Sequence, residues 1–312
     1  MNKTLFKSIR EYKKQSILTP VLVILEVLME VLIPLEMAKI IDVGIANGDL
    51  GYIVQRGVIL VIMAMFALYF GVQAGNMAAV AAAGYAKNLR HDIFYKVQDF
   101  SFKNIDHFST SGLVTRMTTD ITNVQMAYMM SIRLLARAPI MIALSWIMTL
   151  LINVKIALLF LIVIPLLGGT LIFIAKKAHP NFIKVFDEYD ELNNSVQENV
   201  NASRVVKAFV REDHEISKFH GVSNYVYTLF TKAEKIVAWN APVMQFMMYV
   251  VVIMIAVIGG RSIVFGTMET GELTSVIVYA LQILMSLNMV TFVFVMIMIA
   301  GASTDRITEV LN

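Results

Sequence analysis

Long apolar stretches separated by polar ones are the dominant pattern of this 312-residue sequence. A helix that crosses a bilayer needs about 20 mostly apolar residues, and six stretches are long enough. Only Asn153-Val154-Lys155 separates the third stretch from the fourth, which predicts a tight hairpin between antiparallel helices. The pattern predicts an all-α polytopic membrane protein with six long spans, approximately residues 16–45, 57–86, 130–154, 156–178, 236–260 and 272–303.

The two longest polar connections, residues 84–135 and 176–235, keep a helical pattern almost throughout. In the first, apolar residues recur at spacings of four and three, as on one face of a helix, at Tyr85, Leu89, Ile93, Val97 and Phe100. The second carries similar stripes on both sides of Val205–Glu212. Ordinary packing between helices explains the stripes. We therefore expect helices two to five to extend into the cytoplasm, the second by on the order of 30 Å, and to end in exposed tips.

The basic residues predict the orientation of the chain. The 26 Lys and Arg residues lie in residues 1–15, 84–137 and 176–235 and at Arg306, with the exceptions Lys39, Arg56, Lys155 and Arg261. Basic residues favour the cytoplasmic side of a membrane. We expect a multi-pass protein of the cell (plasma or inner) membrane, with both termini and both long connections in the cytoplasm.

Composition excludes several other classes. A chain that is 58% hydrophobic is more apolar than a soluble domain. The net charge of +3 gives no reason to expect a nucleic-acid partner. The sequence contains no cysteine, so it has no disulfide, thiolate metal site or cysteine nucleophile, and its five histidines show no ligand-pair spacing. We therefore predict no metal site and no catalytic residue in this chain.

Polar residues inside the predicted spans are candidates for a substrate cavity. Glu26 and Glu30 are four residues apart, hence on one helical face near the middle of the first span. A charge at this depth costs roughly 2.5–3.5 kcal/mol on insertion scales and usually faces a cavity or a partner. Either these carboxylates line a polar cavity that attracts cationic amphiphiles, or they form internal hydrogen bonds with amides. Those amides are Gln73, Asn76, Gln245 and Asn288.

Two further features of the spans have alternative interpretations. Met285 and other methionines of the sixth span either shape an adaptable pocket or face lipid and neighbouring helices. Gly71 and Gly75, four residues apart in the second span, predict close contact with another helix.

Several short motifs resemble the transmembrane domain of six-helix ABC exporters. The resemblance covers essentially the whole chain and is closest to one chain of the bacterial heterodimeric multidrug exporters. The motifs that carry it are Ile41–Ile45, Leu89–Phe94, Asp106–Met117 with Asp120, Arg204–Glu212 and Ala302–Ile307.

The resemblance implies that each cytoplasmic tip is a short coupling helix that docks on an ATPase domain. The residues involved would be Phe108, Ser109, Thr110 and Gly112 at the first tip and Lys207, Ala208, Phe209, Arg211 and Glu212 at the second. Phe209 would be an aromatic anchor, unless it packs beneath its own helix. The implied partners are ATPase domains, a second exporter half (identical or different), membrane lipid and an amphipathic small-molecule substrate.

These 312 residues contain no GxxxxGK[ST] phosphate loop, so the chain itself holds no cofactor. ATP and Mg²⁺ would bind to ATPase domains that belong either to a longer form of this polypeptide, which we favour, or to a separate chain. The expected function is export of hydrophobic or amphipathic compounds of the multidrug, lipid or peptide class. The alternatives are a membrane channel, a secondary transporter or a scaffold without ATP coupling, for which the sequence shows no pore loop and no convincing inverted repeat.

Overall fold

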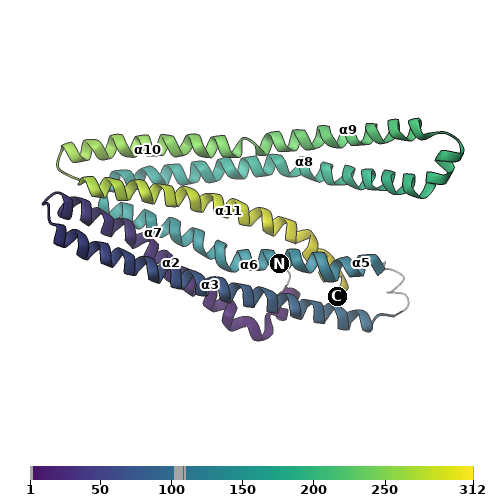
Figure 1. The fold of residues 1–312 in the computed structure, drawn as a ribbon, viewed down its shortest axis with the longest axis horizontal. Helices are drawn as coiled ribbons and strands as arrows, with labels where there is room; N and C mark the ends of the chain where they lie inside the picture. The colour runs from purple at the N-terminus through teal and green to yellow at the C-terminus, as the bar shows by residue number, and fades with distance from the viewer. Residues whose placement is uncertain (1–2, 102–107, 109, 312) are drawn as a thin grey trace. The chain divides into compact units, whose positions relative to one another are not determined.

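The computed structural model describes residues 3–101, 108 and 110–311, and every regular element in them is a helix (Figure 1). Six of the helical segments are long and apolar enough to cross a membrane. The all-α, six-helix prediction is therefore confirmed. The chain divides into two units, one formed by residues 1–160 and 251–312 and the other by residues 161–250. The boundaries between them fall within two long helices, and each unit is described by itself.

Along the chain, the helical elements are α1 Lys3–Phe6, η1 Lys7–Tyr12, α2 Lys13–Lys39, η2 Ile40–Ile45, α3 Leu50–Gln98, α5 Thr110–Thr115, η3 Arg116–Asp120, α6 Ile121–Met130, η4 Ser131–Leu135, α7 Ala136–Ile152, α8 Val154–Ala208, α9 Glu212–Val237, α10 Asn240–Val264 and α11 Thr270–Leu311. Only Asn153 separates α7 from α8, as the predicted hairpin requires.

The second predicted span continues without a break into its polar extension, as expected. Asp49 begins α3 by accepting a 3.0 Å hydrogen bond from the backbone N–H of Tyr52. This cap satisfies one of the N–H groups that a helix start leaves unpaired. No proline interrupts the 49 residues that follow, so nothing removes a hydrogen bond from the interior of the helix.

The predicted apolar stripe of α3 forms part of a core in the first unit. Tyr85, Leu89 and Ile93 are fully buried in one cluster with α6 and with both ends of the chain. Leu5, near the N-terminus, and Ile307, near the C-terminus, belong to the same cluster. Packing between helices therefore explains these stripe positions. The two chain ends also lie at the same end of the unit, as an even number of spans requires.

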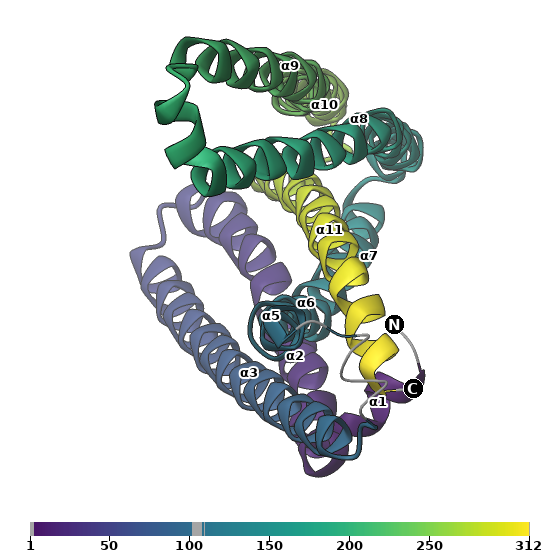
Figure 2. The same ribbon diagram turned by 90° about the vertical axis from the view of Figure 1, so that its right-hand side faces the viewer.

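The helical path into the third span is continuous but contains two π-helical segments, η3 and η4. Between them lies α6, which packs against α3 and α11 (Figure 2). Such segments often occur at functional sites. Each of these two contains a charged residue of interest, because Asp120 in η3 forms an ion pair and Arg133 in η4 lines a cavity.

In the second unit, α8 and α9 form a long antiparallel pair (Figure 1). Phe182 and Phe230 meet edge to face with ring centroids 6.3 Å apart, and Asn199 Nδ2 donates a 2.8 Å hydrogen bond to Glu215 Oε2. The helical path into the fifth predicted span breaks between Val237, where α9 ends, and Asn240, where α10 begins. Pro242 explains this break, since it has no N–H to continue the hydrogen-bond ladder.

Candidate functional site

Arg137 joins the two carboxylates of the first span. Its Nη1 donates to Glu26 Oε1 at 2.6 Å, and its Nη2 donates to Glu30 Oε2 at 2.6 Å and to Oε1 at 2.7 Å. The helical spacing of four places both acids on one face of α2, and Arg137 reaches that face from α7. This ion triad lies within apolar helices and is mostly buried, with exposed side-chain fractions of 11% for Glu26, 29% for Glu30 and 19% for Arg137.

Two glycines of α3 make room for charged side chains. A Cβ atom on Gly71 would lie 2.9 Å from Glu26 Oε1, which is too close for normal contact, and one on Gly75 would lie 3.7 Å from Arg133 Nη1. Only Gly71 is closely approached, and the approaching atoms belong to a charged side chain; the separation at Gly75 is ordinary van der Waals contact. The close contact with another helix that the sequence predicts at these positions stays a prediction.

A cavity of about 540 Å³ opens beside the ion triad. This volume falls in the range of small-molecule sites. One side is apolar, formed by α3 residues such as Leu68 and Val72. The polar lining consists of Glu26, Glu30, Asn76 and Arg133. The structure thus brings together three of the seven residues predicted for a substrate cavity, and we call this space the α2–α3 pocket.

The other four predicted cavity residues do not line the α2–α3 pocket. Gln73 is half-buried on α3, whereas Met285 and Asn288 are exposed on α11. Asn288 Nδ2 donates to the carbonyl of Leu284 in its own helix at 3.4 Å. Gln245 is exposed and belongs to the second unit. The partner of both carboxylates is Arg137 and none of the amides considered from the sequence.

The sequence did not predict that Arg137 pairs with these carboxylates. Arg137 directly precedes a charge-free run and is therefore grouped with the cytoplasmic basic residues. Its position in the sequence did contain a signal. Glu30 lies 15 residues before Ile45, and Arg137 lies 16 residues before Asn153. If both helices end at the same membrane face, their equal rise per residue places the two charges at the same depth.

A second ion pair joins α11 to the start of the third helical path. Arg306 Nε donates to Asp120 Oδ2 at 2.8 Å, and Arg306 Nη2 also donates to Asp120 Oδ1. Asp120 is fully buried, whereas the Arg306 side chain is 48% exposed. Asn123 Nδ2 donates to Ser303 Oγ at 3.2 Å beside this pair. Two of the motifs singled out in the sequence therefore meet here.

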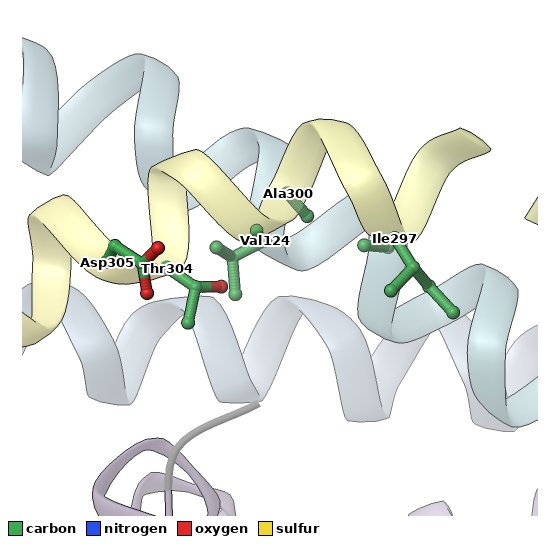
Figure 3. A pocket seen from close by; sticks show the side chains of 7 residues that line it. Val124, Ile297, Ala300, Thr304 and Asp305 are labelled. Atoms are coloured by element: carbon green, nitrogen blue, oxygen red, sulfur yellow. The ribbon is translucent and has the colours of Figure 1, made fainter. Parts of the chain in front are cut away.

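A smaller cavity of about 320 Å³ lies next to this ion pair, between α6 and α11 (Figure 3). Small residues leave the space open, among them Ala127, Ala300 and Gly301. Its polar groups come from Thr304 and Asp305. The volume is at the low end for a ligand site.

At the first cytoplasmic tip, Phe108 packs inward. Its ring stacks on Phe100 with centroids 5.5 Å apart, and the Arg116 guanidinium lies 4.6 Å from its centre. Thr110 and Gly112 belong to α5, whereas Ser109 lies outside the described residues. The coupling role of these residues stays a prediction.

At the second tip, the expected separate coupling helix is not confirmed. Lys207 and Ala208 form the last turn of α8, and Glu212 begins α9. The turn of residues 209–211 joins them, with Val210 at a φ of 53° and a 3.0 Å hydrogen bond from Arg211 N–H to the Val206 carbonyl. Phe209 is 74% exposed, so it does not pack beneath its own helix. An exposed aromatic side chain at a tip is consistent with the predicted docking role.

Comparisons with known proteins agree with the six-helix pattern. The sequence model of one protein family, the ABC transporter transmembrane region, matches residues 16–287. The chain is 32% identical over 292 residues to an uncharacterized ABC transporter ATP-binding protein, YfiB, of Bacillus subtilis (strain 168), covering 94% of this chain and 51% of that protein. It is 28% identical over 311 residues to an uncharacterized ABC transporter ATP-binding protein of Mycobacterium tuberculosis (strain CDC 1551 / Oshkosh), covering 97% and 52%.

A shorter match reaches the ATP-dependent lipid A-core flippase of Desulfotalea psychrophila, with 26% identity over 185 residues, 59% of this chain and 32% of that protein. The chain spans about half the length of the first two relatives.

Proposed function

Because this chain belongs to the family of ABC transporter transmembrane regions, we propose that it is the membrane-spanning half of an ATP-driven exporter. Its substrates are hydrophobic or amphipathic compounds of the multidrug, lipid or peptide class, and it moves them out of the cell. ATP binding on associated ATPase domains switches the membrane helices between inward-facing and outward-facing states. Transport requires that the substrate affinity differ between these states.

The observation that carries this proposal is the ion triad of Glu26, Glu30 and Arg137 beside the α2–α3 pocket. Charged side chains inside a membrane protein are costly and typically face a cavity or a transport pathway. Here they border a space of about 540 Å³ whose other wall is apolar. A site with one apolar side and one charged side suits a compound that has both characters.

Two features support coupling to ATPase domains. Phe209 is exposed at the end of the long α8–α9 pair, where a partner domain can reach it. The Asp120–Arg306 pair joins α11 to the helical path that begins at the first tip. Movement of a docked domain at that tip would therefore be transmitted to α11 through an ion pair as well as through apolar contacts.

The partners follow from the same proposal. ATP and Mg²⁺ are held by ATPase domains, and a second exporter half completes the central cavity. The protein resides in the cell membrane with its termini in the cytoplasm.

The experiment that tests the proposal measures ATP hydrolysis by the transporter assembled with its ATPase domains in lipid vesicles. We expect hydrophobic cations and zwitterionic amphiphiles to stimulate hydrolysis in a saturable way. If ATPase domains assemble with this chain but no amphiphile of either kind alters hydrolysis, the exporter proposal is wrong, and a channel or scaffold becomes the better account.

A further inference from the structure

The α2–α3 pocket contains two separated charges of opposite sign. Within the ion triad, two carboxylates face one guanidinium, so the triad has a formal net charge of −1. Glu30 is its most exposed member, with 29% of the side chain accessible. Arg133 also lines the pocket and forms no ion pair with a described residue. The pocket therefore presents one surplus negative site near Glu30 and one positive site at Arg133.

A second observation identifies the triad as incompletely satisfied. Glu26 is 8% exposed, and its Oε2 has no hydrogen-bond partner among the described residues. Leaving a buried acceptor unpaired costs free energy, so an additional positive charge beside the triad stabilises its carboxylates. A ligand reaches the triad at Glu30, its most exposed member, and an ammonium group supplies three donors there.

The depths of Arg133 and Glu30 in the membrane determine which end of a bound ligand lies beside each of these two charges. Arg133 lies 20 residues before Asn153, where the helical path of α7 ends. At 1.5 Å per residue this is about 30 Å, the thickness of the hydrocarbon core. With the termini on the cytoplasmic side, as proposed above, this rise places the guanidinium of Arg133 at the level of the cytoplasmic lipid phosphates and Glu30 deeper. The apolar side chains of Leu68 and Val72 on α3 form the adjoining wall.

We propose that the α2–α3 pocket binds a zwitterionic amphiphile, with its anionic group at Arg133, its cationic group at Glu30 and its apolar chain along α3. This inference rests on the proposed function and names the substrate class of that cavity. A phospholipid of the cytoplasmic leaflet and an exogenous zwitterionic amphiphile share this chemistry.

The test measures binding to the transporter assembled with its ATPase domains, in detergent and without nucleotide, by fluorescence anisotropy. The probes are lysophosphatidylethanolamine with a label on its acyl chain, an equally labelled anionic lysophosphatidylglycerol, and a labelled alkylammonium. We expect the zwitterion to bind about tenfold more tightly than either singly charged probe, as one charged hydrogen bond predicts. Glycerophosphoethanolamine, the headgroup without an acyl chain, is added as a competitor of the labelled zwitterion. Its competition, or lack of it, shows whether a soluble headgroup is sufficient for binding or an amphiphile is needed.

Two variants locate each charge. Arg133→Gln should abolish the preference for the zwitterion over the alkylammonium, and Glu30→Gln should abolish its preference over the anionic lysolipid. Lys155→Gln removes an exposed positive charge from the hairpin outside the pocket and should leave all affinities unchanged. Equal binding of the three probes, or an unchanged preference in Arg133→Gln, would overturn the inference.

A labelling experiment tests the same site if the charge-removing variants fail to fold. The sequence has no cysteine, so Leu68→Cys introduces the sole thiol at a position that is 67% exposed. Lysophosphatidylethanolamine should slow its reaction with a maleimide about tenfold, as expected for a site occupied at roughly 90%, and lysophosphatidylglycerol should not. Equal reaction rates with and without the zwitterion would contradict the assigned site. Failure of this inference is separable from failure of the exporter proposal, because Arg133→Gln would then leave amphiphile-stimulated ATP hydrolysis intact.

Discussion

Arg137 and Glu26, 111 residues apart in the sequence, are joined by a 2.6 Å hydrogen bond between Nη1 and Oε1 within the apolar part of the bundle. The same guanidinium also holds Glu30, so one cation neutralises half of the charge of two anions. Breaking a buried ion pair by removing one partner is far more costly than removing both partners. The triad therefore acts as a single unit in stabilising the contact between α2 and α7.

We expect Arg137→Gln to lower the free energy of unfolding by about 3–5 kcal/mol, because two buried carboxylates lose their counter-ion. The triple variant Arg137→Gln/Glu26→Gln/Glu30→Gln should recover most of this loss. Thermal unfolding in detergent measures both. The control Arg261→Gln alters an exposed arginine whose side chain contacts only the Phe265 ring among the interactions described. Equal losses for Arg137→Gln and the control would show that the triad contributes nothing.

Gly84 is required where the N-terminal segment packs on α3. A Cβ atom there would lie 2.3 Å from the ring of Tyr12. Asn88 and Asp92, one and two turns later, hold the same segment through hydrogen bonds to the Ser8 carbonyl at 2.9 Å and from the Ser8 hydroxyl at 2.7 Å. The three positions recur every four residues and so form one contact face of α3.

Gly84→Ala should destabilise the protein by about 1–3 kcal/mol, the usual cost of inserting a methyl group into a packed contact. Gly57→Ala in the same helix is the matched control, because nothing lies within 4 Å of its Cβ position. There alanine should stabilise by about 0.5–1 kcal/mol through its higher helix propensity. Chemical unfolding of both variants measures the difference, and a stabilising Gly84→Ala would contradict the described packing.

Asp120 and Arg306 should show asymmetric mutational effects. Arg306→Gln leaves a fully buried carboxylate without its main partner, and we expect a loss of about 3–5 kcal/mol. Asp120→Asn leaves a half-exposed guanidinium that water can solvate, so its cost should be smaller. A double-mutant cycle by chemical unfolding measures the coupling. The Arg116–Glu309 pair, whose carboxylate side chain is 49% exposed, is the control, for which a coupling of about 0–1 kcal/mol is expected. Equal losses for Arg306→Gln and Asp120→Asn would refute the asymmetry.

Glu269, in the turn before α11, should make stability depend on pH. The charge of Asp42, which also accepts a 2.6 Å hydrogen bond from Gly271 N–H, raises the pKa of Glu269 above its usual value, and burial and Glu272 act in the same direction. The folded state then binds the proton more tightly than the unfolded state. Stability is therefore highest below the unfolded pKa and falls as pH rises through the folded pKa.

Glu269→Gln should flatten this fall over the pH range that begins near the ordinary glutamate pKa of about 4 and extends above it. Melting temperatures across that range measure it. The exposed Glu191→Gln on α8 serves as the control and should keep the slope of the parent protein. A Glu269→Gln slope equal to that of the parent protein would show that the repulsion from Asp42 has no influence on stability.

The sequence predicts the helices well because their signals are local. Span length follows from apolar runs, and the burial of Tyr85, Leu89 and Ile93 follows from their spacing. The helix break before Asn240 could also have been predicted from the sequence, because Pro242 disfavours a continuous helix there. By contrast, the π-helical segments η3 and η4 have no local cause that we can identify in the sequence.

The candidate site was only half predictable. Glu26 and Glu30 stand out as charges in an apolar run, and Asn76 joins them through helix packing. Arg137 and Arg133 resemble ordinary cytoplasmic basic residues, because their role depends on which helices become neighbours. Met285 and Asn288 were selected by residue type alone, and their side chains are exposed outside the α2–α3 pocket. Residue chemistry identifies candidates, but tertiary contacts decide which of them meet.

Uptake into inside-out vesicles that contain the assembled transporter measures whether the proposed exporter couples ATP to the movement of amphiphiles. We predict ATP-dependent accumulation of a fluorescent amphiphile. Phe209→Ala should reduce accumulation at least about tenfold, the loss expected for an interface anchor worth about 1.4 kcal/mol or more. Phe265→Ala, which removes a similarly exposed aromatic side chain from a turn between α10 and α11, should not. Accumulation that is independent of ATP, or absent with the ATPase domains bound, would contradict the account.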